Sequence, residues 1–196
     1  MIEENACLLE QEILACTRCR LASGRLHAVP GEGPVPSRII MVGEAPGEQE
    51  DRTGRPFAGR AGTILNNLLA SAGLSRNDVF ITSVLKCRPP GNRDPKADEI
   101  TACKPYLDRQ IVLLRPSVIV PMGRFSASVV MGQFGIPVGK ISGIHGRAFP
   151  ADAPHGPVII FPVYHPAVVT HNPPLREELA ADFRCLKEIL AGSSGA

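Results

Sequence analysis

Four short, unbroken apolar runs alternate with helical segments along the chain, and this alternation is the strongest constraint on its fold. The runs cover residues 38–43, 78–85, 117–121 and 158–163. Apolar residues at helical spacing predict helices over 3–15, 61–73, 95–114 and 124–131, and from 174 onward. Strands that are apolar on both faces are typical of parallel sheets covered by helices. We therefore predict an α/β fold, a three-layer α/β/α sandwich with a central four-stranded, mostly parallel sheet.

Length and composition favour one domain. The chain has 196 residues, of which 44% are hydrophobic and 20% charged, with a net charge of +2. We expect a single domain over 1–196, with an N-terminal helix and a cysteine-containing, metal-binding segment (Cys16, Cys19) at 1–36 and a frayed tail at 192–196. The acidic start and the absence of an apolar run of roughly 18 residues predict no secretory signal, no membrane span and a cytoplasmic location.

Unusual polar residues follow three of the four apolar runs. They occupy 44–51 after the first run, 83–93 after the second, and His165 after the last. Open parallel sheets bind ligands in the crevice outside the carboxyl ends of their strands. We therefore expect these segments to meet in one pocket.

Four of the six cysteines form a set suited to metal binding. Cys16 and Cys19 make a C-x2-C pair, and Cys87 and Cys103 lie after the second apolar run and in the following helix. Cysteines in a cytoplasmic protein favour metal or redox chemistry over disulfides. The spacing alone leaves zinc and an iron-sulfur cluster both open, and either would join the N-terminal helix to the sheet. Cys7 and Cys185 have no such partners, and we interpret them as ordinary thiols.

Four motifs occur in a fixed order. They are Gly43-Glu-Ala-Pro-Gly-Glu-Gln-Glu-Asp51, Thr53-Gly-Arg-Pro-Phe-Ala-Gly-Arg-Ala-Gly62, Lys86-Cys-Arg-Pro-Pro90 and His165-Pro-Ala167. With the cysteine set, these motifs resemble the family 4 uracil-DNA glycosylases over roughly residues 12–190. The resemblance implies a monofunctional enzyme that releases uracil from single- or double-stranded DNA. It also implies that the four cysteines bind a structural 4Fe-4S cluster rather than zinc.

The resemblance also implies the roles of individual residues. Phe57 would stack on the extruded base and His165 would contact its O2 atom. The remaining expected substrate-binding residues are Gly43, Glu44, Ala45, Gly47 and Ser83. A fixed donor at O2 stabilises the negative charge that develops on departing uracil. No lysine takes the place of a nucleophile in these motifs, so strand cleavage through a Schiff base is not expected.

Carboxylates of the first loop are the candidates for orienting water. Glu44 is the first choice and Glu50 the second, whereas Asp51 is expected to be solvated. The best-known related glycosylases carry an Asp where this chain has Ala45. Water activation is therefore expected to be weaker here, or shared between groups.

Two departures from the family pattern affect base choice and DNA binding. Family 4 enzymes usually carry an Asn where this chain has Ser83, and one hydroxyl discriminates uracil from cytosine less well than an amide. A bound water or one of three amides would then assist: Asn66, Asn67 or Asn92. The loop after His165 also differs from the family's compact wedge. Expected DNA contacts are Arg60, Val168, Val169, Leu175 and Arg176.

Two alternatives stay open at this point. One is a glycosylase with looser or shifted base choice, acting on hypoxanthine or xanthine. The other is a non-catalytic, metal-stapled module that binds damaged DNA. In each case DNA is the partner, and a monomer is expected.

Overall fold

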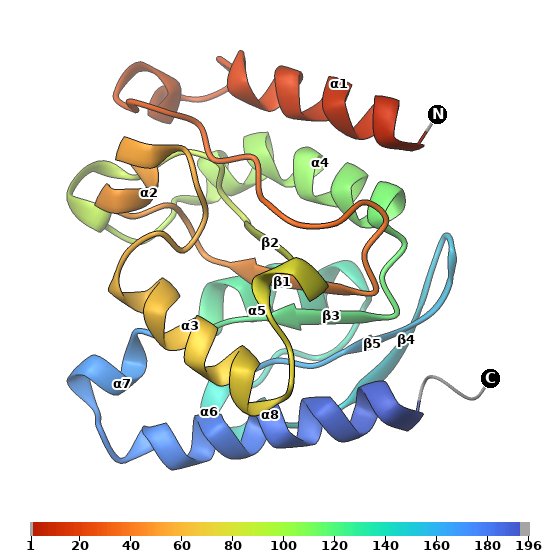
Figure 1. Ribbon diagram of the computed structural model, residues 1–196. Coiled ribbons are helices and arrows are strands. Elements are labelled where there is room, and N and C mark those ends of the chain that lie inside the picture. Colours follow the sequence, from red (N-terminus) through yellow and green to blue (C-terminus); the bar gives the residue numbers. More distant parts are fainter. Residues whose placement is uncertain (1, 193–196) are drawn as a thin grey trace.

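The computed structural model describes residues 2–192, which form a sheet between two layers of helices (Figure 1). Within these residues the sheet has five strands in the order β2-β1-β3-β5-β4. Their bounds are β1 (Ile39–Gly43), β2 (Phe80–Ser83), β3 (Val118–Pro121), β4 (Phe149–Ala153) and β5 (Gly156–Ile160). Strands β2, β1, β3 and β5 are parallel, and β4 pairs antiparallel with β5 at the edge.

Eight α-helices within residues 2–192 connect and cover the strands. They are α1 (Ile2–Leu14), α2 (Glu48–Thr53), α3 (Arg60–Ser71), α4 (Ala97–Leu114), α5 (Arg124–Gln133), α6 (Ile141–Ile144), α7 (Val168–His171) and α8 (Leu175–Gly192). Short 3-10 turns cover Arg20–Ser23, Arg76–Asp78 and Pro90–Asn92. No helix in this part of the chain is long and apolar enough to cross a bilayer.

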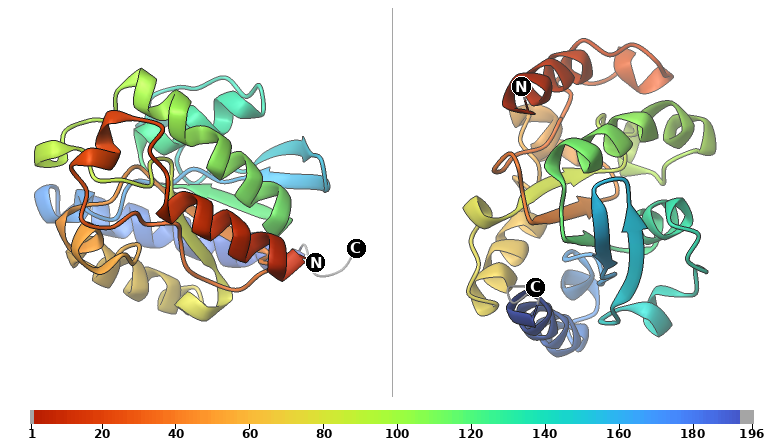
Figure 2. Two further views of the ribbon diagram at one scale, coloured as in Figure 1. Left: turned by 90° about the horizontal axis from the view of Figure 1, so that it is seen from above. Right: turned by 90° about the vertical axis from the view of Figure 1, so that its right-hand side faces the viewer.

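The sheet divides the core into two layers, as its unbroken apolar strands predict. On β1, Ile40 and Val42 pack with residues of α1, α4 and α5, whereas Ile39 and Met41 pack with residues of α3 and α8. Successive side chains of a strand point to opposite faces, so one strand serves both layers. The right-hand view of Figure 2 shows α1 (red) and α4 (green) on one side of the sheet and α3 (yellow) and α8 (dark blue) on the other. The predicted three-layer architecture is confirmed.

The sequence-based prediction missed β4, α2 and two four-residue helices, α6 and α7. The sheet has five strands rather than four, because Phe149–Ala153 forms β4 by pairing with β5 at the sheet edge. This segment contains Pro150 and is only partly buried, so it lacks the apolar run that marks a buried strand. Helix α2 was interpreted as loop because its sequence, EQEDRT, has no apolar periodicity. Of the predicted tail, Gly192 ends α8, and 193–196 lie outside the described residues.

Candidate active site and cysteine cluster

A cavity of about 540 Å³ opens at the carboxyl ends of the parallel strands. That volume is within the range of small-molecule sites. Its walls come from the loop after β1, the Phe57 loop, the segment after β2 and the segment after β5. Helices α2 and α7, which contribute to it, lie at the same end of the sheet (Figure 1). The predicted residues that line it are Glu44, Ala45, Gly47, Glu50, Phe57, Ser83, Asn92 and His165.

The ends of β1 and β2 are adjacent at this cavity, which Ser83 lines and Gly43 does not. Gly43 is the register partner of Ser83, and the Ser83 side chain is buried against the cavity. A Cβ atom on Gly43 would lie 2.8 Å from Cε2 of Phe57 and 3.0 Å from Oγ of Ser83. Real Cβ atoms are not found as close as 2.8 Å to such a neighbour. The absence of a side chain at Gly43 therefore makes room for the Phe57 ring.

Phe57 and His165 line the same cavity, as the strand-end argument predicts. Their rings are stacked, with centroids 5.7 Å apart and planes 27° from parallel. Aromatic rings in direct contact have centroids roughly 4.5–7 Å apart. A base therefore does not fit between the two rings, and it must meet Phe57 and His165 as neighbouring parts of one wall.

His165 is held as a neutral imidazole. Burial lowers its pKa to about 4, although the charge of Glu50 acts in the opposite direction. The backbone N–H of Ala167 donates to Nδ1 at 3.2 Å, so the single ring proton is placed on Nε2. Gly123 allows the close approach of the histidine, because a Cβ atom there would lie 3.0 Å from the His165 Cβ. The result is a fixed, uncharged donor at the cavity wall.

The three carboxylates of the first loop have different environments. Burial, assisted by the charge of Asp94, raises the pKa of Glu44. Glu50 accepts hydrogen bonds from the backbone N–H groups of Gly47 and Gly59, each at 3.0 Å. It therefore joins the two cavity loops, which gives it a positioning role.

The expectation that Asp51 is solvated was wrong. Its side chain is buried and Oδ1 accepts from the backbone N–H of Leu26 at 3.0 Å. Its backbone carbonyl oxygen lies 2.8 Å from Nδ1 of His27. These contacts attach α2 to the N-terminal segment, and a carboxylate can be buried when hydrogen bonds satisfy it.

Of the three candidate amides, Asn92 alone among the described residues lines the cavity. Asn66 and Asn67 lie on the exposed side of α3, and Asn66 accepts from Arg76 at 3.5 Å. The Asn92 side-chain oxygen accepts from Arg88 at 2.8 Å, and the cavity can receive its remaining amide donors. Of the three amides, Asn92 is therefore the one placed to assist Ser83 in contacting a base.

The predicted DNA contacts are distributed between surface and core. Arg60 and Arg176 are exposed, and neither lines the cavity. Val168 and Leu175 are partly buried and pack against the apolar core. The expected DNA contact by Val169 was wrong, because its side chain is 5% exposed and belongs to that core.

All six cysteines lie within the described residues, and none of them forms a disulfide. Cys16 follows α1, Cys19 precedes the turn Arg20–Ser23, Cys87 follows β2, and Cys103 is in α4. Burial raises the pKa of Cys103 to about 11, and the charges of Cys87 and Cys19 raise it too. The pKa of Cys87 is likewise raised by burial and by the charges of Cys19 and Cys16. The four predicted ligands are thus electrostatic neighbours, although in the described part of the chain no group of metal-binding side chains is tight enough to hold a single ion.

Hydrogen-bond donors surround the sulfur atoms of this set. Arg25 Nη1 donates to Cys87 Sγ at 3.0 Å, and the backbone N–H of Lys86 donates to Cys103 Sγ at 3.2 Å. A third donor, the backbone N–H of Arg18, lies 3.5 Å from Cys16 Sγ. Donors of this kind stabilise thiolates and tune the potential of iron-sulfur clusters. The residues present therefore fit a cluster with cysteine ligands.

Comparison with known proteins agrees with this geometry. The profile of the uracil DNA glycosylase superfamily matches residues 30–189. A type-4 uracil-DNA glycosylase of Sulfurisphaera tokodaii is 46% identical over 92% of this chain and 83% of its own length. Enzymes of the same name from Saccharolobus solfataricus and Archaeoglobus fulgidus are 45% and 44% identical, over 96% and 91% of this chain and 88% and 90% of their own lengths. The chain belongs to the type-4 uracil-DNA glycosylases.

The cavity also includes residues that the sequence motifs did not indicate. Among them are Val29 and His171. His171 ends α7 six positions after His165, so its place in the loop after the His-Pro motif was the available signal. Val29 reaches the cavity because its N–H donates to the carbonyl of Lys86 at 2.7 Å, and no local pattern predicts that long-range contact.

Proposed function

We propose that this chain hydrolyses the N-glycosidic bond of deoxyuridine in DNA, releasing uracil and leaving an abasic site. Family membership supports the reaction class. The observation that carries the proposal is the meeting of Phe57, Ser83, Glu44 and His165 at one cavity, with His165 kept neutral. An extruded base needs a flat partner, edge recognition and a donor for its developing charge.

His165 would supply that donor. Cleavage leaves negative charge on uracil, and the Nε2–H group of the neutral imidazole can donate a hydrogen bond to O2. Because Ala167 fixes Nδ1 as the acceptor, the donor requires no tautomeric change during the reaction. Removal of one such donor in other enzymes lowers the rate roughly 100- to 1,000-fold.

Phe57 would receive the face of the base. Stacking of a base on an aromatic ring contributes roughly 1–3 kcal/mol, which offsets the unstacking of the base from the duplex. Ser83 would meet the polar edge, with Asn92 as the second polar group on the cavity wall.

Glu44 would orient the attacking water. It lines the cavity, and its raised pKa increases its basicity relative to an exposed glutamate. Glu50 would keep the Gly47 and Gly59 loops together rather than contact the reacting atoms.

The environment of the lysines near the site supports a monofunctional reaction. No lysine is among the described residues that line the cavity. Lys86 is fully buried, and its Nζ donates to Thr82 Oγ1, the Ser83 carbonyl and Gln110 Oε1 at 2.6–2.7 Å. A Schiff base requires a free amine that can reach the sugar.

We further propose that Cys16, Cys19, Cys87 and Cys103 bind a structural 4Fe-4S cluster. Four thiolates suit such a cluster, in which the cysteines bind different iron atoms and lie farther apart than around one zinc ion. When bound, the cluster would join the N-terminal segment to β2 and α4. We also propose that the protein acts as a monomer in the cytoplasm, and that the exposed Arg60 and Arg176 contact DNA phosphates.

The test uses purified protein and oligonucleotides that contain one uracil, hypoxanthine or xanthine. Alkali treatment reveals abasic sites. We expect cleavage at uracil in single- and double-stranded DNA. In His165→Ala the rate should fall roughly 100- to 1,000-fold, whereas the control His155→Ala, in the remote β4–β5 turn, should keep the wild-type rate. Cleavage confined to hypoxanthine or xanthine would favour the shifted-base alternative. DNA binding without cleavage of any base would favour the non-catalytic module.

A further inference from the structure

Phe57 has an unusual backbone conformation. Its φ is +50°, in the left-handed region that bulky residues rarely adopt, and its side chain is 9% exposed. Such a conformation persists when the surrounding structure determines it. The direction of the ring in the cavity depends on this backbone geometry, so the contacts that hold it affect how a base would stack.

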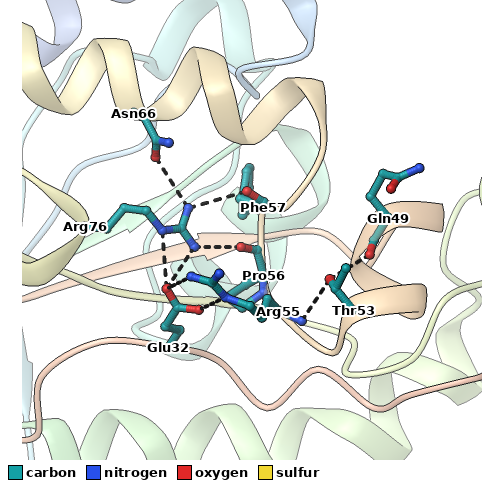
Figure 3. Close-up of polar contacts among 8 residues, drawn as sticks. All are labelled: Glu32, Gln49, Thr53, Arg55, Pro56, Phe57, Asn66 and Arg76. Carbon is teal, nitrogen blue, oxygen red and sulfur yellow. Dashed lines mark hydrogen bonds and ion pairs between the residues drawn. The ribbon is translucent and has the colours of Figure 1, made fainter.

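Arg76 provides direct contacts to this segment. It begins the 3-10 turn after α3, and its Nη2 donates to the Pro56 carbonyl at 2.7 Å. Its Nη1 donates to the Phe57 carbonyl at 3.4 Å and to Asn66 Oδ1 at 3.5 Å. Figure 3 shows the guanidinium between α3 and the Phe57 loop, with its donors directed at these oxygens.

The first turn of α3 packs against the other side of the Phe57 carbonyl group. A Cβ atom on Gly62 would lie 1.7 Å from the Phe57 oxygen, so α3 and the Phe57 backbone are in close contact. The Phe57 carbonyl is therefore confined between the Gly62 backbone and the Arg76 guanidinium.

Glu32 holds Arg76 in place. Its Oε1 accepts from Nε and Nη2 of Arg76, each at 3.4 Å, and its carboxylate also binds Arg55 at 2.8 and 3.0 Å (Figure 3). The Glu32 backbone pairs with Ile81 through hydrogen bonds of 2.9 and 2.8 Å. Since Ile81 is two positions before Ser83 in β2, the network relates the Phe57 loop to the strand that ends in the base-contacting serine.

We propose that Arg76 is a positioning residue that sets the orientation of the Phe57 ring by clamping the Pro56 and Phe57 carbonyls, with Glu32 as its anchor. The inference depends on the proposed function. Arg76 does not line the cavity, so it acts on the base only through Phe57. Arg55 is 66% exposed, contacts Glu32 and makes no contact with either carbonyl, so its contribution is smaller.

The test is a double-mutant cycle on single-turnover uracil excision. Arg76→Met is expected to lower the rate between roughly 10- and 100-fold, because small displacements of reacting groups have effects of that size. In a Phe57→Ala background the same change is expected to lower the rate by less than about twofold, because coupled residues give non-additive effects. Arg76→Lys, which can still reach one carbonyl, is expected to restore part of the rate.

Arg109→Met is the matched control. Arg109 also forms a two-pronged ion pair, with Glu12, but between α4 and α1 and away from the cavity. The single-turnover excision rate of Arg109→Met should equal that of the wild type. Thermal unfolding of each variant separates stability from positioning, and Glu32→Gln tests the anchor if Arg76→Met does not fold.

The proposal is overturned if Arg76→Met lowers the rate by the same factor with and without Phe57, or if Arg76→Met and Glu32→Gln both leave the rate unchanged. Either result leaves the proposed function intact, because wild-type excision is measured in the same assay. An inactive wild type would overturn both proposals together.

Discussion

The protonation state of His165 gives the sharpest prediction. Burial lowers its pKa from 6.5 to about 4, and the Ala167 N–H fixes the remaining proton on Nε2. At pH 5 an imidazole with the ordinary pKa would be about 97% protonated, whereas His165 should be only about 10% protonated. We therefore predict that acidification from pH 8 to pH 5 leaves this ring neutral.

Nitrogen NMR of the histidine rings measures this directly. The chain has five histidines, and the spectrum of His165→Gln identifies the signal that belongs to His165. The predicted result is a neutral Nε2–H pattern that is unchanged between pH 8 and pH 5. A titration midpoint near 6.5, or a proton on Nδ1, would refute the reasoning.

The same pKa difference predicts how stability depends on pH. Because the folded pKa is below the unfolded value, the unfolded state takes up a proton first, and stability is lost as pH falls from about 6.5 to about 4. From pH 7.5 to pH 5 the free energy of unfolding should fall by about 2 kcal/mol more in the wild type than in His165→Gln. Chemical denaturation at each pH measures the difference, and parallel curves would contradict the assignment.

Three substitutions test the rest of the cavity. Ser83→Asn should raise uracil excision or narrow base choice, and unchanged profiles on uracil, hypoxanthine and xanthine would argue against Ser83 as a reader. Glu44→Gln should lower single-turnover cleavage roughly 100-fold or more with DNA binding kept, unlike the exposed control Glu48→Gln. Gly43→Ala should displace Phe57 and lower excision, because its Cβ would lie 2.8 Å from the ring. Wild-type activity in that variant would show that the Phe57 ring can move without loss of function.

The order of elements was predictable because most strands are buried on both faces. Residues 38–43 and 117–121 were recognised as strands by their apolar runs, and the structure places β1 and β3 at the centre of the sheet. Strand β4 escaped prediction because an edge strand needs no such run. Helix α2 escaped because its start depends on Gly47 and Glu50, whose capping contacts carry no apolar periodicity.

The location of the cavity followed from one topological rule, whereas its internal contacts did not. Strand ends placed Ser83 and His165 together, and the structure confirms that they line one cavity. The Glu32–Arg76 contact joins residues 44 positions apart through long side chains, so no local sequence pattern could indicate it. The burial of Asp51 was unexpected for the same reason, since its partner Leu26 lies in a distant loop.

In the proposed complex, one cavity wall holds an extruded uracil with Phe57 at its face and His165 at its O2 atom. The most direct measurement is a crystal structure of the protein with DNA carrying a 2′-fluoro-deoxyuridine, which resists cleavage. We predict uracil within the cavity, stacked on the Phe57 ring, with Nε2 of His165 at hydrogen-bonding distance from O2. A uracil that remains in the duplex, or that occupies another site away from these two rings, would contradict the proposed roles of Phe57 and His165.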